Sequence, residues 1–210
     1  MAVARSLVLL CLLGLWATSL AGPQHASAAQ DGDAPQWPGI ADTGWQAHAV
    51  LKVGGEEISL EIYHDDGRER QETTLDGTLQ VVILRPELGR AFVVLPEQDD
   101  VIEISLDDAG VLPFSVGFDD VRTDFLGEEM LGGEKTWHYR VVGPDRLGQH
   151  FEGEVWVTPD GIPLRMEGEV TAGGDLVDFS MQLSLLSRGD QPEYLFVPPV
   201  ESPSALSGGG

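Results

Sequence analysis

The chain is almost free of cysteine and poor in basic residues. Its one cysteine, Cys11, lies inside an apolar run near the start. A domain formed by the rest of the chain has neither disulfides nor thiol chemistry, so its core alone must hold it together. Lysine and arginine number 12, against 35 aspartates and glutamates. This balance argues against nucleic acid and anionic membrane surfaces as partners, because both bind basic patches.

The apolar run at the start is too short to span a membrane. It extends from Leu7 to Ala17 and is interrupted by Gly14, whereas a spanning helix needs about 20 residues. Arg5 before the run and Ala26-Ser27-Ala28 after it are typical of a signal peptide cleaved before Ala29. Residues 1–28 are therefore predicted to be a signal peptide, with an uncleaved membrane anchor as the alternative. After cleavage we expect no stable insertion into a membrane and a periplasmic location.

Cleavage leaves enough chain for one domain with a substantial core. Lipidation is not expected, because Leu10 precedes Cys11 where a lipoprotein signal needs a small residue. Cleavage removes one base, Arg5, and no acid, which takes the formal net charge from −23 to −24. Disorder is the usual consequence of such charge, but a hydrophobic share of 42% indicates a folded core. A saline habitat, where salt screens the repulsion, stays open as a reason for the acidity.

The hydrophobic pattern of the central part has a period of two, which predicts strands. Apolar and polar residues alternate over 45–53 and 58–62, and Gly54-Gly55 between them predicts a tight hairpin turn. Residues 79–84 and 91–95 carry apolar residues on both faces, which predicts central strands covered on each side. The domain is predicted over 44–198, with a flexible lead at 29–43 and a disordered tail at 199–210.

The second half of the domain gives the clearer pattern. Thr158-Pro159-Asp160-Gly161 predicts a turn with Gly161 in the left-handed conformation. With a three-residue loop there, Trp156, Leu164 and Met166 would share one face. Residues 107–120 give no clear pattern. Further strands are predicted at 101–106, up to Leu131, at 136–142, 152–157, 162–170 and 178–186, and at Tyr194 to Val197.

About ten short strands at hairpin spacing, without a helical stripe, predict an all-β fold. At most one or two short helices are expected besides the signal peptide. The strand spacing is compatible with a curved sheet, a barrel or a sandwich.

Three stretches resemble motifs that one protein family shares. Residues 126–133, continued by Thr136 and Tyr139-Arg140-Val141, are similar to a hairpin of the pattern "LGxExxxGxxTxxYRV". Residues 155–166, VWVTPDGIPLRM, are similar to a hairpin of the pattern "WVTxDGIPxRM", the most specific of the three. Arg85-Pro86-Glu87-Leu88, followed by residues 94–98, VLPEQ, resembles a third shared segment. The family that these motifs resemble is one of small periplasmic proteins related to the LolA/LolB-like lipoprotein carriers.

The resemblance implies a strongly curved antiparallel half-barrel with a short helix or loop against its concave side. In the carriers this concavity shelters lipoprotein acyl chains, so an acyl chain or other apolar ligand is the implied partner. The sequence differs from the carriers in lacking the long helices that cover their cavity.

Catalytic and metal-binding patterns are weak. No G-x-S-x-G elbow or phosphate-binding glycine motif occurs, so we expect neither an enzyme nor a cofactor. Paired acids could bind calcium at the surface or protect strand ends, and accidental carboxylate pairs leave glycosidase-like chemistry open. Histidines brought together by folding could bind metal, although hydrogen-bonded or solvated histidines are expected. The histidines of the mature chain are His48, His64, His138 and His150, and the acid pairs are Asp65-Asp66, Asp99-Asp100, Asp107-Asp108 and Asp119-Asp120.

The sequence therefore predicts a non-enzymatic periplasmic module that binds a lipid, a lipoprotein acyl chain or another apolar ligand in a concave sheet. The alternative is an envelope scaffold or protein-interaction module with a filled core and no ligand. Apolar pockets with a few polar groups suit such ligands, and aromatics with a polar tip suit the rim. The candidate lining residues are Phe92, Val94, Trp137, Tyr139, Trp156 and Met166.

Overall fold

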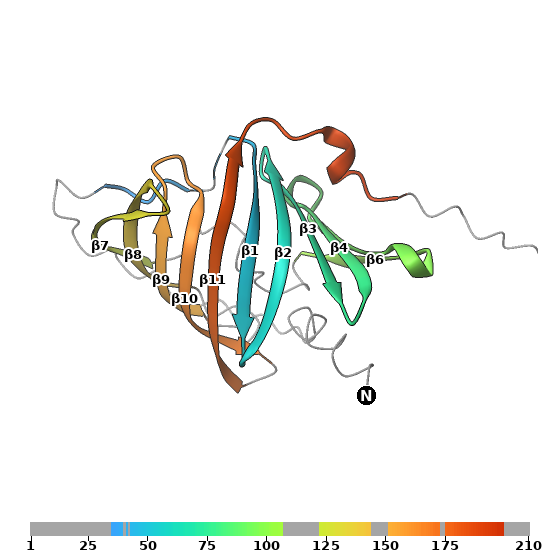
Figure 1. Cartoon of the computed structure of the whole chain (residues 1–210), viewed down its shortest axis with the longest axis horizontal. Helices are drawn as coiled ribbons and strands as arrows, with labels where there is room; N and C mark the ends of the chain where they lie inside the picture. Colours follow the sequence, from blue (N-terminus) through green and yellow to red (C-terminus); the bar gives the residue numbers. More distant parts are fainter. Residues whose placement is uncertain are drawn as a thin grey trace, which may run out of the picture.

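The computed structural model describes residues 35–39, 41, 43–106, 122–143, 151–172 and 175–199. These residues form one antiparallel sheet of eleven strands, in the order β6-β5-β4-β3-β2-β1-β11-β10-β9-β8-β7 (Figure 1). The first strand thus pairs with the last at the centre of the sheet. The strands are β1 (Trp45–Val53), β2 (Glu56–Asp65), β3 (Arg68–Leu75), β4 (Thr78–Arg85), β5 (Arg90–Leu95), β6 (Asp100–Ser105), β7 (Arg122–Leu131), β8 (Glu134–Val142), β9 (Phe151–Val157), β10 (Pro163–Ala172) and β11 (Asp175–Arg188).

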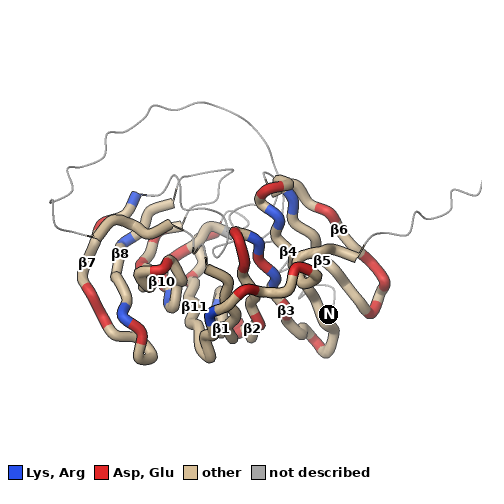
Figure 2. The backbone as a smooth tube through the Cα atoms, turned by 90° about the horizontal axis from the view of Figure 1, so that it is seen from above, with Lys and Arg blue, Asp and Glu red and all other residues tan. Residues whose placement is uncertain are grey.

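The sheet curves strongly and stays open. Seen from above, it forms an arc in which β7 and β8 at one end and β5 and β6 at the other rise on the same side of β11, β1 and β2 (Figure 2). β6 and β7 are the two edge strands, and no pairing joins them in the described part of the chain. The all-β fold and the half-barrel expected from the resemblance are confirmed.

Alternation along β1 and β2 sorts their side chains between the two faces of the sheet. In β1 every second residue from Trp45 to Val53 is buried. The intervening residues Gln46 and Lys52 are exposed, as are Glu57 and Glu61 on β2. Residues paired across a ladder point to the same side, so the buried row of β1 continues into β2 and β11. This face, the concave face, lies inside the arc, and the opposite face is the convex face.

Two predictions about individual strands need correction. β4 and β5 are covered on both faces, as their apolar sequences predict, but they lie near one end of the sheet and not at its centre. The strand predicted at Tyr194 to Val197 is wrong. Residues Glu193–Phe196 form a single 3-10 turn, η4, after Pro192. The segment is too short to form a ladder, and its buried Phe196 packs on the convex face beside Ile83.

Several predictions fall on other parts of the chain. The signal peptide at 1–28, residues 107–120, His150 and the tail beyond residue 199 lie outside the described residues. Within the described ranges, no helix is long and apolar enough to cross a membrane.

Candidate functional site

The concave face is the largest apolar surface that the described strands build. Its side chains come from both halves of the chain, because β1 and β11 pair at the centre of the sheet. They form one cluster with Phe125 of β7 and Leu75 of β3 at its margins. Residues of the cluster that face one another across neighbouring strands include Ala49, Leu60, Val155, Met166, Met181 and Leu183.

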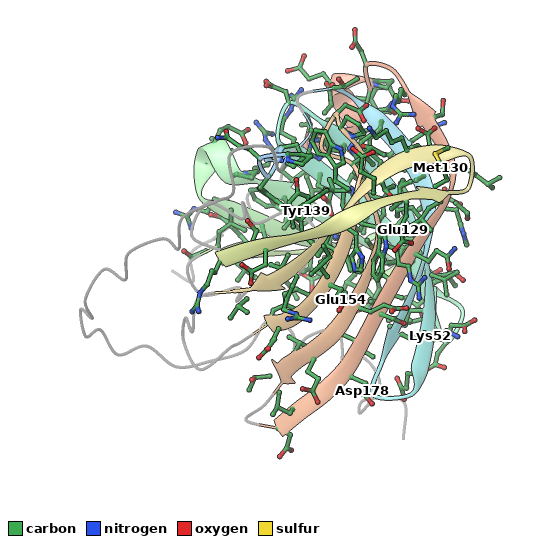
Figure 3. All side chains as sticks on the ribbon, turned by 90° about the vertical axis from the view of Figure 1, so that its left-hand side faces the viewer. Lys52, Glu129, Met130, Tyr139, Glu154 and Asp178 are labelled. Atoms are coloured by element: carbon green, nitrogen blue, oxygen red, sulfur yellow. The ribbon has the colours of Figure 1, made fainter. Side chains whose placement is uncertain are left out.

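A strap of non-strand residues, Pro35–Gly39 and Ala41, lies against one end of this face. The Tyr139 hydroxyl donates to the carbonyl oxygens of Pro35 and Gln36, at 3.0 and 3.2 Å. The Trp37 ring meets the Tyr139 ring edge-on, with 5.1 Å between centroids. The strap marks the end of the sheet where β1 begins, and Lys52 and Asp178 mark the opposite end (Figure 3).

His64 ties the strap to β2. Its Nε2 lies 2.9 Å from the carbonyl oxygen of Ala41. Since a carbonyl only accepts, Nε2 carries the hydrogen in this contact. Burial lowers the pKa of His64, although the Ala41 contact opposes the shift. The ring also stacks on Trp45 at 5.4 Å. His64 is therefore a buried, hydrogen-bonded residue, one of the two kinds of histidine that the sequence analysis expected.

A polar stripe along β3 crosses the apolar concave face. Glu69, Gln71 and Thr73 are all buried and share one side of this strand. The stripe separates the large apolar cluster from a smaller one on β4 and β5 around Leu84 and Val93. All three side chains take part in hydrogen bonds: Thr73 donates to the Ser59 carbonyl at 2.8 Å, and the Gln71 amide donates to Glu69 at 2.6 Å.

Glu69 is the most unusual group of the stripe. Its side chain is fully buried, with Leu84 on one neighbouring strand and His64 on the other. Oε1 accepts the hydrogen bond from Gln71, whereas Oε2 has no hydrogen-bond partner in the described structure. Burial raises the pKa of Glu69 to about 7, against the smaller opposing effect of the Gln71 hydrogen bond. The group thus titrates near neutral pH.

The six lining residues predicted from the sequence divide between the two faces. Trp137, Tyr139 and Met166 belong to the concave face and its apolar cluster. Phe92 and Val94 belong to the convex face, where they pack in the cluster around Phe196. The structure therefore does not bring the six together at one site.

Trp156 also lies on the convex face. A bulge at Leu164 shifts the β9–β10 register, so Trp156 pairs with Arg165 and Met166 pairs with Val155. The expectation that Trp156 shares a face with Leu164 and Met166 is therefore wrong. The Trp156 ring is instead enclosed between His138, stacked at 4.1 Å, and the Arg165 guanidinium at 4.7 Å.

The polar stripe is the feature that the sequence interpretation missed. No strand was predicted at residues 68–75, because RERQETTL has almost no apolar residue. The available signal was the pair of turns at its ends. Asp66-Gly67 and Asp76-Gly77 both have positive φ, the conformation of the Asp-Gly hairpin turn. Two such turns mark β3 without any hydrophobic pattern.

Metal chemistry finds no support in the part of the chain that the structure describes. No group of three or more histidine, cysteine or acidic side chains is placed there to hold an ion.

The fold and the concave face define an open, strongly curved β half-barrel with a polar stripe on an apolar inner surface. No protein-family model matches the chain, and no curated protein matches it. Solved structures do. A chain from the Pseudomonas aeruginosa MucA/MucB complex aligns at 19% identity over 76% of this chain and 56% of its own length, with a TM-score of 0.47. The chain spans 54–60% of the length of the chains matched in three MucB structures.

Two further solved structures that align with this chain are of proteins other than MucB. The LolA superfamily protein NE2245 from Nitrosomonas europaea aligns at 9% identity over 75% of this chain and 91% of its own, with a TM-score of 0.41. The Mycobacterium tuberculosis lipoprotein LppX aligns at 14% identity over 66% and 84%, with a TM-score of 0.38. The structural neighbours thus include the superfamily that the motifs resemble. At these identities the likeness is one of fold alone.

Proposed function

We propose that the chain is an exported, non-enzymatic module of the bacterial envelope that holds an apolar ligand, such as an acyl chain, against its concave face. The observation that carries the proposal is the composition of this face. Apolar side chains from six strands form one continuous cluster there, with a short polar stripe beside it on β3. Apolar ligands bind surfaces of this kind, in which a few polar groups fix orientation.

Burial of a single alkyl chain would supply enough free energy for useful affinity. Each methylene buried from water contributes about 0.8 kcal/mol. A long alkyl chain half enclosed by the sheet would therefore reach roughly micromolar affinity after the cost of association. The negative charge of the protein does not oppose a neutral chain.

The second candidate is a scaffold or protein-interaction module with a filled core. It is favoured by the burial of the concave side chains, since Ala49 and Met166 are both 0% exposed. A core filled in this way would leave no room for a ligand.

Tryptophan quenching distinguishes the two candidates. Trp37, Trp45 and Trp137 belong to the concave cluster, and Trp156 lies on the convex face. A long-chain alcohol brominated in mid-chain quenches tryptophans that it contacts. If the ligand enters the concavity, we expect saturable quenching that decreases in Trp137→Phe.

Trp156→Phe is the matched control, because it removes a tryptophan from the opposite face and should leave the quenching in place. Circular dichroism verifies that each variant is folded. If folded wild-type protein shows no saturable quenching, the ligand-binding proposal fails and the scaffold candidate is favoured.

The location has its own test. If the first 28 residues direct export, protein recovered from the periplasm should begin at or within two residues of Ala29, which intact-mass measurement determines. A membrane-bound chain that still contains Met1 would contradict cleavage.

A further inference from the structure

Three buried side chains lie in one row across β1, β2 and β3 at the strapped end of the concave face. Trp45 pairs directly with His64, and His64 pairs directly with Glu69. Their exposed fractions are 3%, 2% and 0%. Because His64 also contacts Ala41 of the strap, the row lies at the boundary between the strap and the apolar face.

Two polar atoms of this row have no hydrogen-bond partner in the described structure. They are the indole Nε1 of Trp45, a donor, and Oε2 of Glu69, an acceptor in the ionised form of the carboxyl group. His64 between them is already engaged, through Nε2, with the Ala41 carbonyl. A buried polar atom without a partner costs free energy, so one unmet donor and one unmet acceptor on the same face favour a ligand that can satisfy both.

The chemistry of the two atoms selects among polar head groups. A carboxylate could accept from Trp45, but its charge would oppose that of Glu69. An ammonium could donate to Glu69, but it has no lone pair for the Trp45 N–H. A hydroxyl both donates and accepts. His64 lies between Trp45 and Glu69 across the sheet. A head group with more than one hydroxyl therefore suits the row best, because it can reach both atoms.

We propose that Trp45 and Glu69 select ligands with an uncharged, hydroxyl-bearing head group, such as the glycerol of a monoacylglycerol, and place its alkyl chain along the apolar concave face. This inference rests on the proposed function. It adds the chemical class of the ligand and its direction: the head group lies at the strap, and the chain extends toward the end of the sheet marked by Lys52 and Asp178.

The test compares three ligands of equal chain length at pH 8: monomyristoylglycerol, myristic acid and tetradecylamine. Isothermal titration with wild-type protein should give the tightest binding for the glycerol ester. Glu69→Leu removes the acceptor and should weaken ester binding about tenfold, the equivalent of one hydrogen bond to a charged group. Glu69→Gln keeps hydrogen-bonding capacity, so the ester should bind within about threefold of wild type while myristic acid binds more tightly.

Glu72→Gln is the control for charge alone. Glu72 lies on the same strand but on the convex face, where Arg70 binds it at 2.6 Å. Glu72→Gln removes the same formal charge as Glu69→Gln does, and it should leave the ratio of ester to acid affinity unchanged.

Several results would overturn the inference while leaving the proposed function intact. They are equal affinity for ester and acid in the wild type, tightest binding of the amine, or an ester-to-acid ratio that Glu69→Leu does not change. Failure of all three ligands to bind folded protein is a different result, and it would refute the proposed function itself.

Discussion

At the scale of single residues, the buried Glu69 makes stability depend on pH. Its folded-state pKa of about 7 lies above the ordinary value of 4.5. Between these values the folded protein holds a proton that the unfolded chain has released. Stability from this group is therefore fully present below about pH 4.5, falls as the pH rises toward 7, and stays low above it. The difference between the two pKa values corresponds to about 3 kcal/mol.

We therefore expect Glu69→Gln to become more stable than the wild type as the pH rises. The gain should increase across the window from about pH 4.5 to 7 and reach at most about 3 kcal/mol at pH 8. Urea denaturation at pH 4.5 and pH 8 measures it, with Glu72→Gln as the variant that corrects for surface charge. A gain that is the same at both pH values would show that Glu69 does not titrate in this window.

Gly161 is a second residue whose backbone decides what can replace it. Its φ is +87°, as the Pro-Asp-Gly sequence predicts, and an added Cβ would lie 2.8 Å from the Ala41 backbone nitrogen. Gly77 has a similar φ of +83° and open space around it. The two sites thus share the backbone strain and differ in packing against the strap.

Gly77→Val should cost about 1–3 kcal/mol through strain alone, and Gly161→Val should cost more, because it also displaces Ala41. Denaturation midpoints of the two variants give the comparison. Equal costs would mean that the strap gives way without loss, and an unchanged midpoint for Gly161→Val would contradict the left-handed turn.

At the scale of elements, the strands with one solvated face could be predicted from their alternation. β1, β2 and the turn at Gly54 and Gly55 are examples, since every second residue is buried along most of each strand. β3 could not be found in this way, because its inward side carries Glu69, Gln71 and Thr73. The polar residues on its inward side made β3 unrecognisable from hydrophobicity. The same residues form the polar part of the candidate site.

The face of the sheet on which a residue lies was harder to predict than the strand to which it belongs. One extra residue reverses the side on which every later side chain lies. The bulge at Leu164 did so for Trp156 relative to Met166. Hydrophobicity could not reveal it, because Trp156 is buried on the convex face by His138 and Arg165. Phe92 and Val94 were ambiguous for the same reason: both faces of β5 are covered.

The strap depends on Tyr139 for its attachment to the sheet. Burial raises the pKa of this hydroxyl to about 12, so it stays protonated and donates to the strap carbonyls at physiological pH. Tyr139→Phe should lower stability by about 1 kcal/mol and speed proteolytic cleavage before Trp45.

Tyr194→Phe is the matched control for the strap, because Tyr194 is an exposed residue of η4. It should change neither stability nor cleavage. If a protease cleaves the Tyr139→Phe variant at the wild-type rate, the hydroxyl does not hold the strap.

At the scale of the whole molecule, charge repulsion opposes compaction. Acidic residues occur along strands throughout the arc (Figure 2), and many of the ion pairs are solvent-exposed, as that of Lys52 with Glu57 is. Exposed pairs contribute little. The melting temperature of the mature protein should therefore rise with sodium chloride, since the screening length falls to about 3 Å at 1 M. Calorimetry between low and molar salt tests this, and a flat melting temperature would contradict it.

The strand order has a consequence for the route by which the protein folds. Among the described strands, every pairing from β1 to β6 and from β7 to β11 joins neighbours in sequence, and only β1 with β11 joins distant ones. Hairpins between sequence neighbours form within microseconds, whereas a pairing that closes a long loop must first overcome its entropy. The two arms of the sheet can therefore assemble independently, and the seam between β1 and β11 should form last. Leu51 and Met181 face each other across that seam, so a continuous concave surface exists only once the final folding step is complete.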